Sequence, residues 1–201
     1  MRRISITVAV ISLLSLVACG VGTTGLSPES SRRPKGNPSA LVFVTEYGDF
    51  QCPACKTSHE LITKSIFQKY GDTIRFEFKQ FPLTTIHEYS LEAAEASECA
   101  ADQGKFWEFV DLAYAQQEQL SSTALRDWAK VLGLDVSLFD RCIRSDIKKN
   151  TIMADEAEGE KLGVDSTPTY FVNGQRITDL TLQTVSDAID QALASAMKVP
   201  L

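Results

Sequence analysis

The chain has 201 residues, a length that suits one domain, or one domain with an insertion, and that can bury a core without disulfide staples. Hydrophobic residues make up 44% of it and charged residues 23%, which is ordinary for a globular protein. The formal net charge of −6 argues against a nucleic-acid-binding surface. No apolar stretch reaches the length of about 18 residues that a membrane span needs.

The N-terminus has the pattern of an export signal. Two arginines precede residues 4–17, a mostly apolar run that is too short to cross a membrane. The run ends in Leu16-Val17-Ala18-Cys19, which resembles a bacterial lipobox. We therefore predict a lipoprotein signal peptide over 1–18, lipidation of Cys19, and an extracytoplasmic protein anchored to a bacterial membrane. The alternative is an ordinary signal peptide with an incidental cysteine.

Residues 19–39 are predicted to be the lipidated N-terminus and a flexible tether, because this segment is rich in Gly, Ser, Thr and Pro. Beyond the tether, strand and helix patterns alternate, which predicts an α/β fold. The expected elements are a buried strand over 40–47, a helix over 52–70, a strand over 74–79, a helical block over 84–160, a strand over 169–172 with an Asn173-Gly174 hairpin turn, and a last helix over 182–193.

The helical block lies between two halves of one predicted sheet. Those halves, 40–83 and 161–201, need each other to bury their apolar faces, so the block over 84–160 is predicted to be an α-helical insertion. The acids from Asp155 to Glu160 are expected to form a solvated helix face, and His87 to be a surface or packing residue.

The chemistry of the chain is concentrated in Cys52-Pro53-Ala54-Cys55, which follows a buried strand and opens a helix. In that context a C-x-x-C is typical of a redox site. The free N–H groups and the positive dipole end of a helix N-terminus stabilise an anion, which favours the thiolate of Cys52 as the attacking sulfur. Cys55 lies one turn deeper, near enough to close a disulfide and to resolve a mixed disulfide.

Two other interpretations of this motif compete with the redox site. A purely structural Cys52–Cys55 disulfide would close a very small loop and would stabilise the fold little. A metal site is the other alternative, because Cys52, Cys55 and His59 share one helical face. The metal site lacks an evident fourth ligand.

Two further residues are candidates for the same site. Glu46 is the one acid of its apolar strand; buried there it would have a raised pKa and could exchange a proton with Cys55. The alternative is an edge position with the carboxylate in water. Thr167-Pro168 precedes a strand, where proline is permitted, and sequence alone does not show whether the bond is cis.

Together these motifs resemble the DsbA-like thiol–disulfide oxidoreductases, which have a thioredoxin fold with a helical insertion. The resemblance covers residues 40–196 and includes Asp49 to Pro53, Gln103 to Trp107 and Thr167 to Gly174. It implies that Pro168 is a cis-proline facing the active-site disulfide and that Thr167 offers its backbone to a substrate peptide. It also places Glu46 at the family's buried acid. The dipeptide is Pro-Ala here rather than Pro-His, so weaker stabilisation of the thiolate is expected.

Cys99 and Cys142 lie 43 residues apart in the helical block. In an exported protein a structural disulfide between them is favoured over two buried free thiols, and some DsbA-like proteins resemble this arrangement. Closing that loop would stabilise the domain by about 4 kcal/mol on the chain-entropy model.

These observations lead to one functional hypothesis with two alternatives. The chain is predicted to exchange disulfides with exported proteins as a dithiol oxidase, with no cofactor beyond its own redox-active disulfide. By family resemblance a membrane partner, such as a quinone-linked reoxidase, would restore that disulfide. The alternatives are a disulfide reductase or isomerase of the same fold, and a metal-binding lipoprotein that uses Cys52, Cys55 and His59.

Overall fold

A computed structural model describes residues 23–197. A five-stranded mixed sheet has the order β1-β3-β2-β4-β5. In chain order the elements are β1 (Lys35–Gly36), β2 (Val42–Gly48), α1 (Pro53–Ser58), the π-helical turn η1 (His59–Thr63), α2 (Lys64–Tyr70), β3 (Ile74–Gln80), α3 (Ser90–Ala101), α4 (Phe106–Ala115), the short 3₁₀ helix η2 (Gln117–Gln119), α5 (Ser122–Val131), α6 (Val136–Arg144), α7 (Lys149–Lys161), β4 (Thr169–Val172), β5 (Gln175–Arg176) and α8 (Leu182–Ala196).

The centre of the sheet joins the two halves of the chain. β2 pairs in parallel with β3 and antiparallel with β4, so it is buried on both faces, as its continuous apolar run predicts. β3 buries every second residue, in agreement with its alternating pattern. Asn173 and Gly174 both have positive φ, the backbone that a two-residue turn between β4 and β5 requires.

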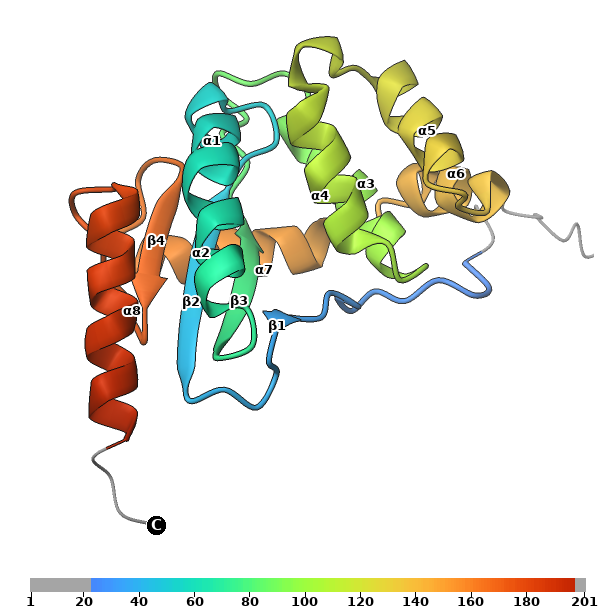
Figure 1. Cartoon of the computed structure of the whole chain (residues 1–201). Coiled ribbons are helices and arrows are strands. Elements are labelled where there is room, and N and C mark those ends of the chain that lie inside the picture. The colour runs from blue at the N-terminus through green and yellow to red at the C-terminus, as the bar shows by residue number, and fades with distance from the viewer. Residues whose placement is uncertain (1–22, 198–201) are drawn as a thin grey trace, which may run out of the picture.

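Helices cover both faces of the sheet (Figure 1). The α1–η1–α2 helix and α8 pack on one face, over a core that includes Val44, Phe76 and Ile189. α7 crosses the other face, where Gly159 lies so close to Tyr47 and Phe81 that an added Cβ would come within about 3 Å of both rings. This three-layer arrangement confirms the thioredoxin-like fold predicted for the chain.

The remaining helices, α3 to α6, form a bundle beside the sheet (Figure 1). A disulfide joins Cys99 in α3 to Cys142 in α6, with an S–S distance of 2.00 Å. The predicted insertion over 84–160 is too long at its end, because α7 packs against β3 and belongs to the layers around the sheet. The helical insertion itself is therefore α3 to α6.

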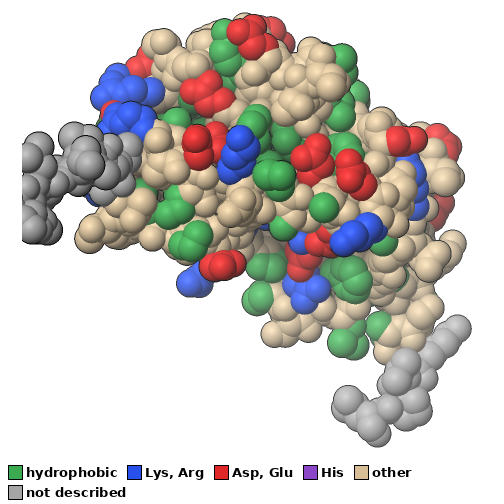
Figure 2. Space-filling view, turned by 180° about the vertical axis from the view of Figure 1, so that it is seen from behind, with side chains coloured by type: hydrophobic (Ala, Val, Ile, Leu, Met, Phe, Trp, Pro, Cys, Tyr) green, Lys and Arg blue, Asp and Glu red, His purple; other side chains and the backbone are tan. Residues whose placement is uncertain are grey.

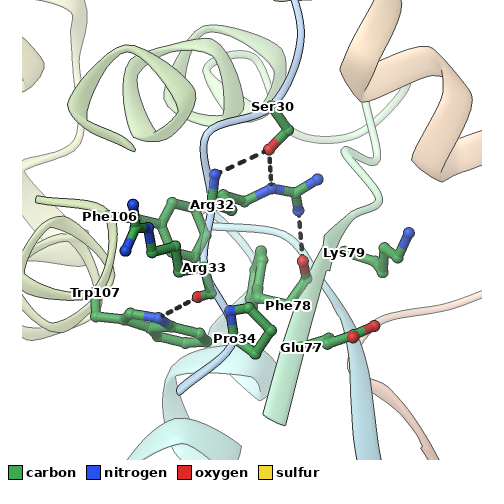
Figure 3. A pocket seen from close by; sticks show the side chains of 9 residues that line it. All are labelled: Ser30, Arg32, Arg33, Pro34, Glu77, Phe78, Lys79, Phe106 and Trp107. Atoms are coloured by element: carbon green, nitrogen blue, oxygen red, sulfur yellow. Dashed lines mark hydrogen bonds between the residues drawn. The ribbon is translucent and has the colours of Figure 1, made fainter. Parts of the chain in front are cut away.

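The prediction of a flexible tether is wrong for residues 23–39. Lys35 and Gly36 form the edge strand β1 on β3. Upstream of β1, the indole of Trp107 donates a hydrogen bond to the Arg33 carbonyl at 2.9 Å (Figure 3). Lys148 is 1% exposed, and its amino group donates a hydrogen bond to the Glu29 carbonyl at 2.8 Å. The composition of the segment could not predict these contacts, because their partners lie far away in the sequence. Residues 1–22, which include the predicted signal peptide and Cys19, lie outside the part of the chain that the structure describes.

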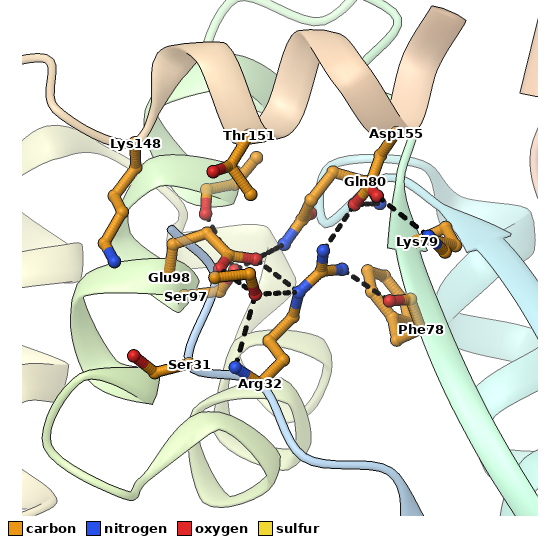
Figure 4. Close-up of polar contacts among 12 residues, drawn as sticks. Ser31, Arg32, Phe78, Lys79, Gln80, Ser97, Glu98, Lys148, Thr151 and Asp155 are labelled. Carbon is orange, nitrogen blue, oxygen red and sulfur yellow. Dashed lines mark hydrogen bonds and ion pairs between the residues drawn. The ribbon is translucent and has the colours of Figure 1, made fainter. Parts of the chain in front are cut away.

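Arg32 is the centre of this N-terminal segment (Figure 4). Its guanidinium forms ion pairs with Glu98 at 2.7 Å and with Asp155 at 2.5 Å, and it also donates to the Phe78 carbonyl. Asp155 is thus buried rather than part of a solvated acidic face. Because Glu98 lies on α3 and Asp155 on α7, Arg32 links the insertion to the sheet layers.

The surface carries both signs of charge. On the face seen in Figure 2, acidic and basic side chains are interspersed rather than gathered by sign. Within residues 23–197, no helix combines the length and the apolar character needed to cross a bilayer.

We predict that Arg32→Met destabilises the protein by about 3 kcal/mol, because it leaves two carboxylates buried without their shared cation. The free energy of unfolding in urea measures this loss. Arg33→Met is the matched control, since that side chain is exposed and only its backbone carbonyl is bonded. Equal stabilities of the two variants would contradict the role given to Arg32.

Candidate active site

The two cysteines of the motif occupy different environments at the start of α1. Cys52 is the N-cap residue of the helix, with Pro53 in its first turn. Both are free thiols; Cys52 is 7% exposed, and Cys55 is fully buried. Cys52 Sγ lies 3.3 Å from the carbonyl oxygen of Thr167, so the sheet and the helix meet at this sulfur.

The surroundings of Cys52 favour its thiolate. A hydrogen bond from the Cys55 thiol lowers the pKa of Cys52 most, and the Thr167 hydroxyl and the backbone N–H groups of Ala54 and Cys55 lower it further. Burial opposes them, and the resulting pKa is about 5, against an ordinary value of 9.0. At neutral pH Cys52 is therefore a thiolate, the form that attacks a disulfide.

Cys55 has the opposite bias. Burial raises the pKa of its thiol well above 9.0, and the hydrogen bond it donates to Cys52 and the charge of Glu46 raise it further. The Asp49 amide points at Cys55 Sγ from 3.5 Å. The site thus holds one sulfur ready to react and one that keeps its proton until a base removes it.

Glu46 is the candidate base. It lies on β2 and is 1% exposed, with one oxygen accepting a hydrogen bond from Thr63 at 3.3 Å. Burial raises its pKa from 4.5 to about 7, while hydrogen bonds from Tyr170 and Thr63 oppose that rise. A carboxyl with this pKa can both accept and donate a proton near neutral pH.

The Thr167–Pro168 peptide bond is cis and precedes β4, beside the motif. Thr167 is 8% exposed, and its side chain lies close enough to Cys52 to lower the pKa of that thiol. The structure therefore brings together Glu46, Cys52, Cys55, Thr167 and Pro168, which are spread over more than a hundred positions of the chain.

Further residues hold the loop between β2 and α1, and the sequence analysis missed them. Buried Asp49 accepts hydrogen bonds from the amides of Gln51 and Leu83 and is paired with His87 at 2.8 Å. His87 is therefore a structural partner of this loop. The only sequence signal was the position of Asp49, three residues before the motif.

The insertion also holds the motif. The side-chain amide of Gln117 donates to the carbonyl oxygens of Phe50 and Cys52, at 2.8 and 3.0 Å. His59, on the same helix as the cysteines, is paired through Nε2 with Asp111 of α4 at 2.8 Å. One ring nitrogen of His59 is thus engaged with the insertion. No group of three or more His, Cys, Asp or Glu side chains within residues 23–197 is placed to hold a metal ion.

Two grooves border the motif. One is lined by Ala54 of the motif, by Pro168 and by exposed Leu61 and Leu182, and it is mainly apolar. The other is more polar; Gln51, Pro53, Lys56 and Glu118 are among its lining residues. Cys52 lies between Pro53 and Ala54 on one side and Thr167 on the other, where an extended peptide could reach both grooves.

Comparisons with known proteins agree with this geometry. Residues 30–191 match the family described as Thioredoxin. The chain is 36% identical over 160 residues to the Na(+)/H(+) antiporter NhaA 1 of Mycobacterium sp. (strain KMS), covering 78% of this chain and 26% of that protein. It is 36% identical over 168 residues to NhaA 1 of Salinispora arenicola (strain CNS-205), covering 83% and 25%. The chain thus spans about a quarter of the length of these curated relatives.

Solved structures give the same fold. BdbD from Bacillus subtilis in its oxidised form is similar with a TM-score of 0.73 and 24% identity, covering 82% of this chain and 94% of that one. Wolbachia pipientis alpha-DsbA1 has a TM-score of 0.73 and 23% identity, covering 82% and 92%. These similarities confirm the DsbA-like form of the thioredoxin fold, with its helical insertion.

We predict that the absorbance of the reduced protein at 240 nm, which follows thiolate formation, titrates with a midpoint of about pH 5 for Cys52. Cys55→Ala should move this midpoint upward, because the variant removes the donor that lowers the pKa of Cys52 most. Cys99 and Cys142 form a disulfide and do not contribute. A wild-type midpoint near 9.0 would contradict the site as described.

Proposed function

This chain belongs to the thioredoxin family, and we propose that it acts as a dithiol oxidase of exported proteins. Its enzyme class is thiol–disulfide oxidoreductase, because its C-x-x-C lies near a buried acid and a cis-proline. The observation that carries the proposal is the inequality of the two thiols, one favoured as a thiolate and one buried with its proton.

The proposed cycle begins with the Cys52–Cys55 disulfide. A substrate thiolate attacks Cys52 Sγ, the bond between the two cysteines breaks, and Cys55 leaves as a thiolate that takes a proton from Glu46. A second substrate thiolate then attacks the substrate sulfur of the mixed disulfide and releases Cys52 as a thiolate. Two electrons have passed from the substrate dithiol to the cysteine pair.

The direction of the reaction follows from which form is stabilised. Hydrogen bonds to the Cys52 thiolate exist only in the reduced pair, so they stabilise the reduced form and make the disulfide more oxidising. This supports an oxidase over the alternative of a reductase or isomerase. The Pro-Ala dipeptide supplies no histidine to this stabilisation, which here comes from Cys55, Thr167 and the helix N-terminus.

Substrate binding is proposed at the groove beside Pro168. Thr167 would pair its backbone with an extended substrate segment, and the apolar groove would take a neighbouring side chain. Hydrophobic segments that are exposed only before folding suit such a groove, which supports unfolded exported proteins as substrates.

The cellular setting is also part of the proposal. The lipobox-like residues 16–19 support export and attachment to a bacterial membrane outside the cytoplasm, where disulfides form and persist. A membrane reoxidase, quinone-linked by family resemblance, would return the cysteine pair to its disulfide. The alternative of a metal-binding lipoprotein has less support, because no three His, Cys, Asp or Glu side chains within residues 23–197 are placed together to hold a metal ion.

Cys55→Ser is expected to trap substrates, because its Cys52 thiolate can attack a substrate disulfide, expelling one substrate thiolate, and no Cys55 remains to resolve the mixed disulfide from within the site. The trapped species would be identified by mass spectrometry of adducts separated on non-reducing gels from the envelope fraction. The double variant Cys52→Ser/Cys55→Ser is the control and should yield none. If Cys55→Ser accumulates no adducts beyond that control, the proposed activity is wrong.

The reduction potential of the Cys52–Cys55 pair is expected to lie closer to about −120 mV than to about −270 mV, as suits an oxidase. Equilibration with glutathione buffers, followed by thiol alkylation and mass spectrometry, measures it. A value at the reducing end would favour the reductase alternative.

A further inference from the structure

Oε1 of Glu46 and the hydroxyl of Tyr114 on α4 are buried near the motif and have no hydrogen-bonding partner within the described residues. Tyr114 is fully buried. A phenylalanine would fill the same space without leaving a polar atom unsatisfied, so this hydroxyl needs an explanation.

The hydroxyl of Tyr114 lies beside Gly48, the last residue of β2. A Cβ added to Gly48 would stand 3.2 Å from it, and the next amide, that of Asp49, points at Cys55 Sγ. The Tyr114 hydroxyl and Cys55 Sγ therefore lie next to two consecutive backbone residues, Gly48 and Asp49. The Tyr114 ring is held there between Phe50 and His59, with ring centroids 5.5 and 5.0 Å away.

The other hydroxyls of this region are already engaged. The hydroxyl of Tyr170 is 2.6 Å from Thr63 Oγ1 and accepts a hydrogen bond from Ser58 at 3.0 Å. Thr63 also donates to Glu46. Tyr114 is thus the buried phenol of this site that still has a proton to donate.

We propose that Tyr114 is a positioning residue for thiol–disulfide exchange, whose O–H donates a hydrogen bond to Cys55 Sγ when that sulfur is a thiolate. The inference rests on the exchange chemistry of the proposed function. When the Cys52–Cys55 bond is broken by a thiolate, its electron pair passes to Cys55, and the Tyr114 O–H stabilises that charge until Glu46 supplies a proton. In the reverse step Glu46 takes the proton and Cys55 attacks.

The charges around Tyr114 keep it a donor. Burial raises its pKa well above 10.0, and negative charge on Cys55 and Glu46 raises it further. The titratable groups that face the Tyr114–Cys55 region from its packed elements are Glu46 of β2, Asp49 of the loop, Cys52 of α1, His59 of η1 with its partner Asp111 of α4, and Tyr170 of β4.

Tyr114→Phe tests the inference in the full chain. The reduced protein is mixed with oxidised glutathione: Cys52 first forms a mixed disulfide with glutathione, and Cys55 then attacks Cys52 and expels glutathione. The first step should keep its wild-type rate. The second step should be about tenfold slower at pH 7, because losing a hydrogen bond to its charge raises the pKa of Cys55 and leaves less of the attacking thiolate.

Tyr70→Phe is the matched control. Tyr70 is also buried, but its hydroxyl donates to the Ser186 carbonyl at 3.3 Å on the far part of the sheet. This variant should lose stability and leave the pH dependence of the second step unchanged. Tyr114→Phe should show the reverse pattern, because it removes no hydrogen bond present in the reduced state.

A second-step pH profile of Tyr114→Phe that superimposes on the wild type would overturn the inference. An equal shift in both variants would overturn it too, since the effect would then be one of packing. Glutathione stands in for a protein substrate here. A failure to trap exported proteins with Cys55→Ser would therefore count against the proposed function and not against the role of Tyr114.

Discussion

The stabilised charge of Cys52 is the interaction on which the rest of the site depends. The sulfur lies where the start of α1 meets the residues before β4, so helix N–H groups, the Cys55 thiol and Thr167 all act on one atom. The same arrangement buries Cys55 and raises its pKa. Two identical side chains three residues apart thus acquire opposite chemical roles, because one faces a groove and the other faces the core.

The insertion does more than cover the sheet. Gln117 holds the carbonyl oxygens of Phe50 and Cys52, and Asp111 is paired with His59 on the motif's own helix. Arg32 in turn joins α3 and α7 through two buried carboxylates. A segment more than fifteen residues upstream of the thiol pair thus helps to hold the insertion that contacts the motif.

Prediction from sequence succeeded where local pattern and burial agree. The alternating β3, the Asn173-Gly174 turn and the helix after Cys52 were all visible, because each depends on neighbours along the chain. It failed for residues 23–39, whose polar composition is typical of a linker but whose Arg32 has partners 66 and 123 positions away. It also placed α7 in the insertion, because a helical pattern does not show which layer the helix joins.

The sequence by itself determined the class of chemistry: a C-x-x-C at a helix start after a buried strand, with an acid in that strand and a Thr-Pro before a later one. These are short-range features, and short-range physics is enough to indicate them. Only the tertiary structure decided the proton chemistry. Whether Glu46 has a pKa of about 7, whether Cys55 is shielded from water and whether Tyr114 keeps a free O–H depend on burial by segments far away in the chain, because desolvation comes from the whole packed environment.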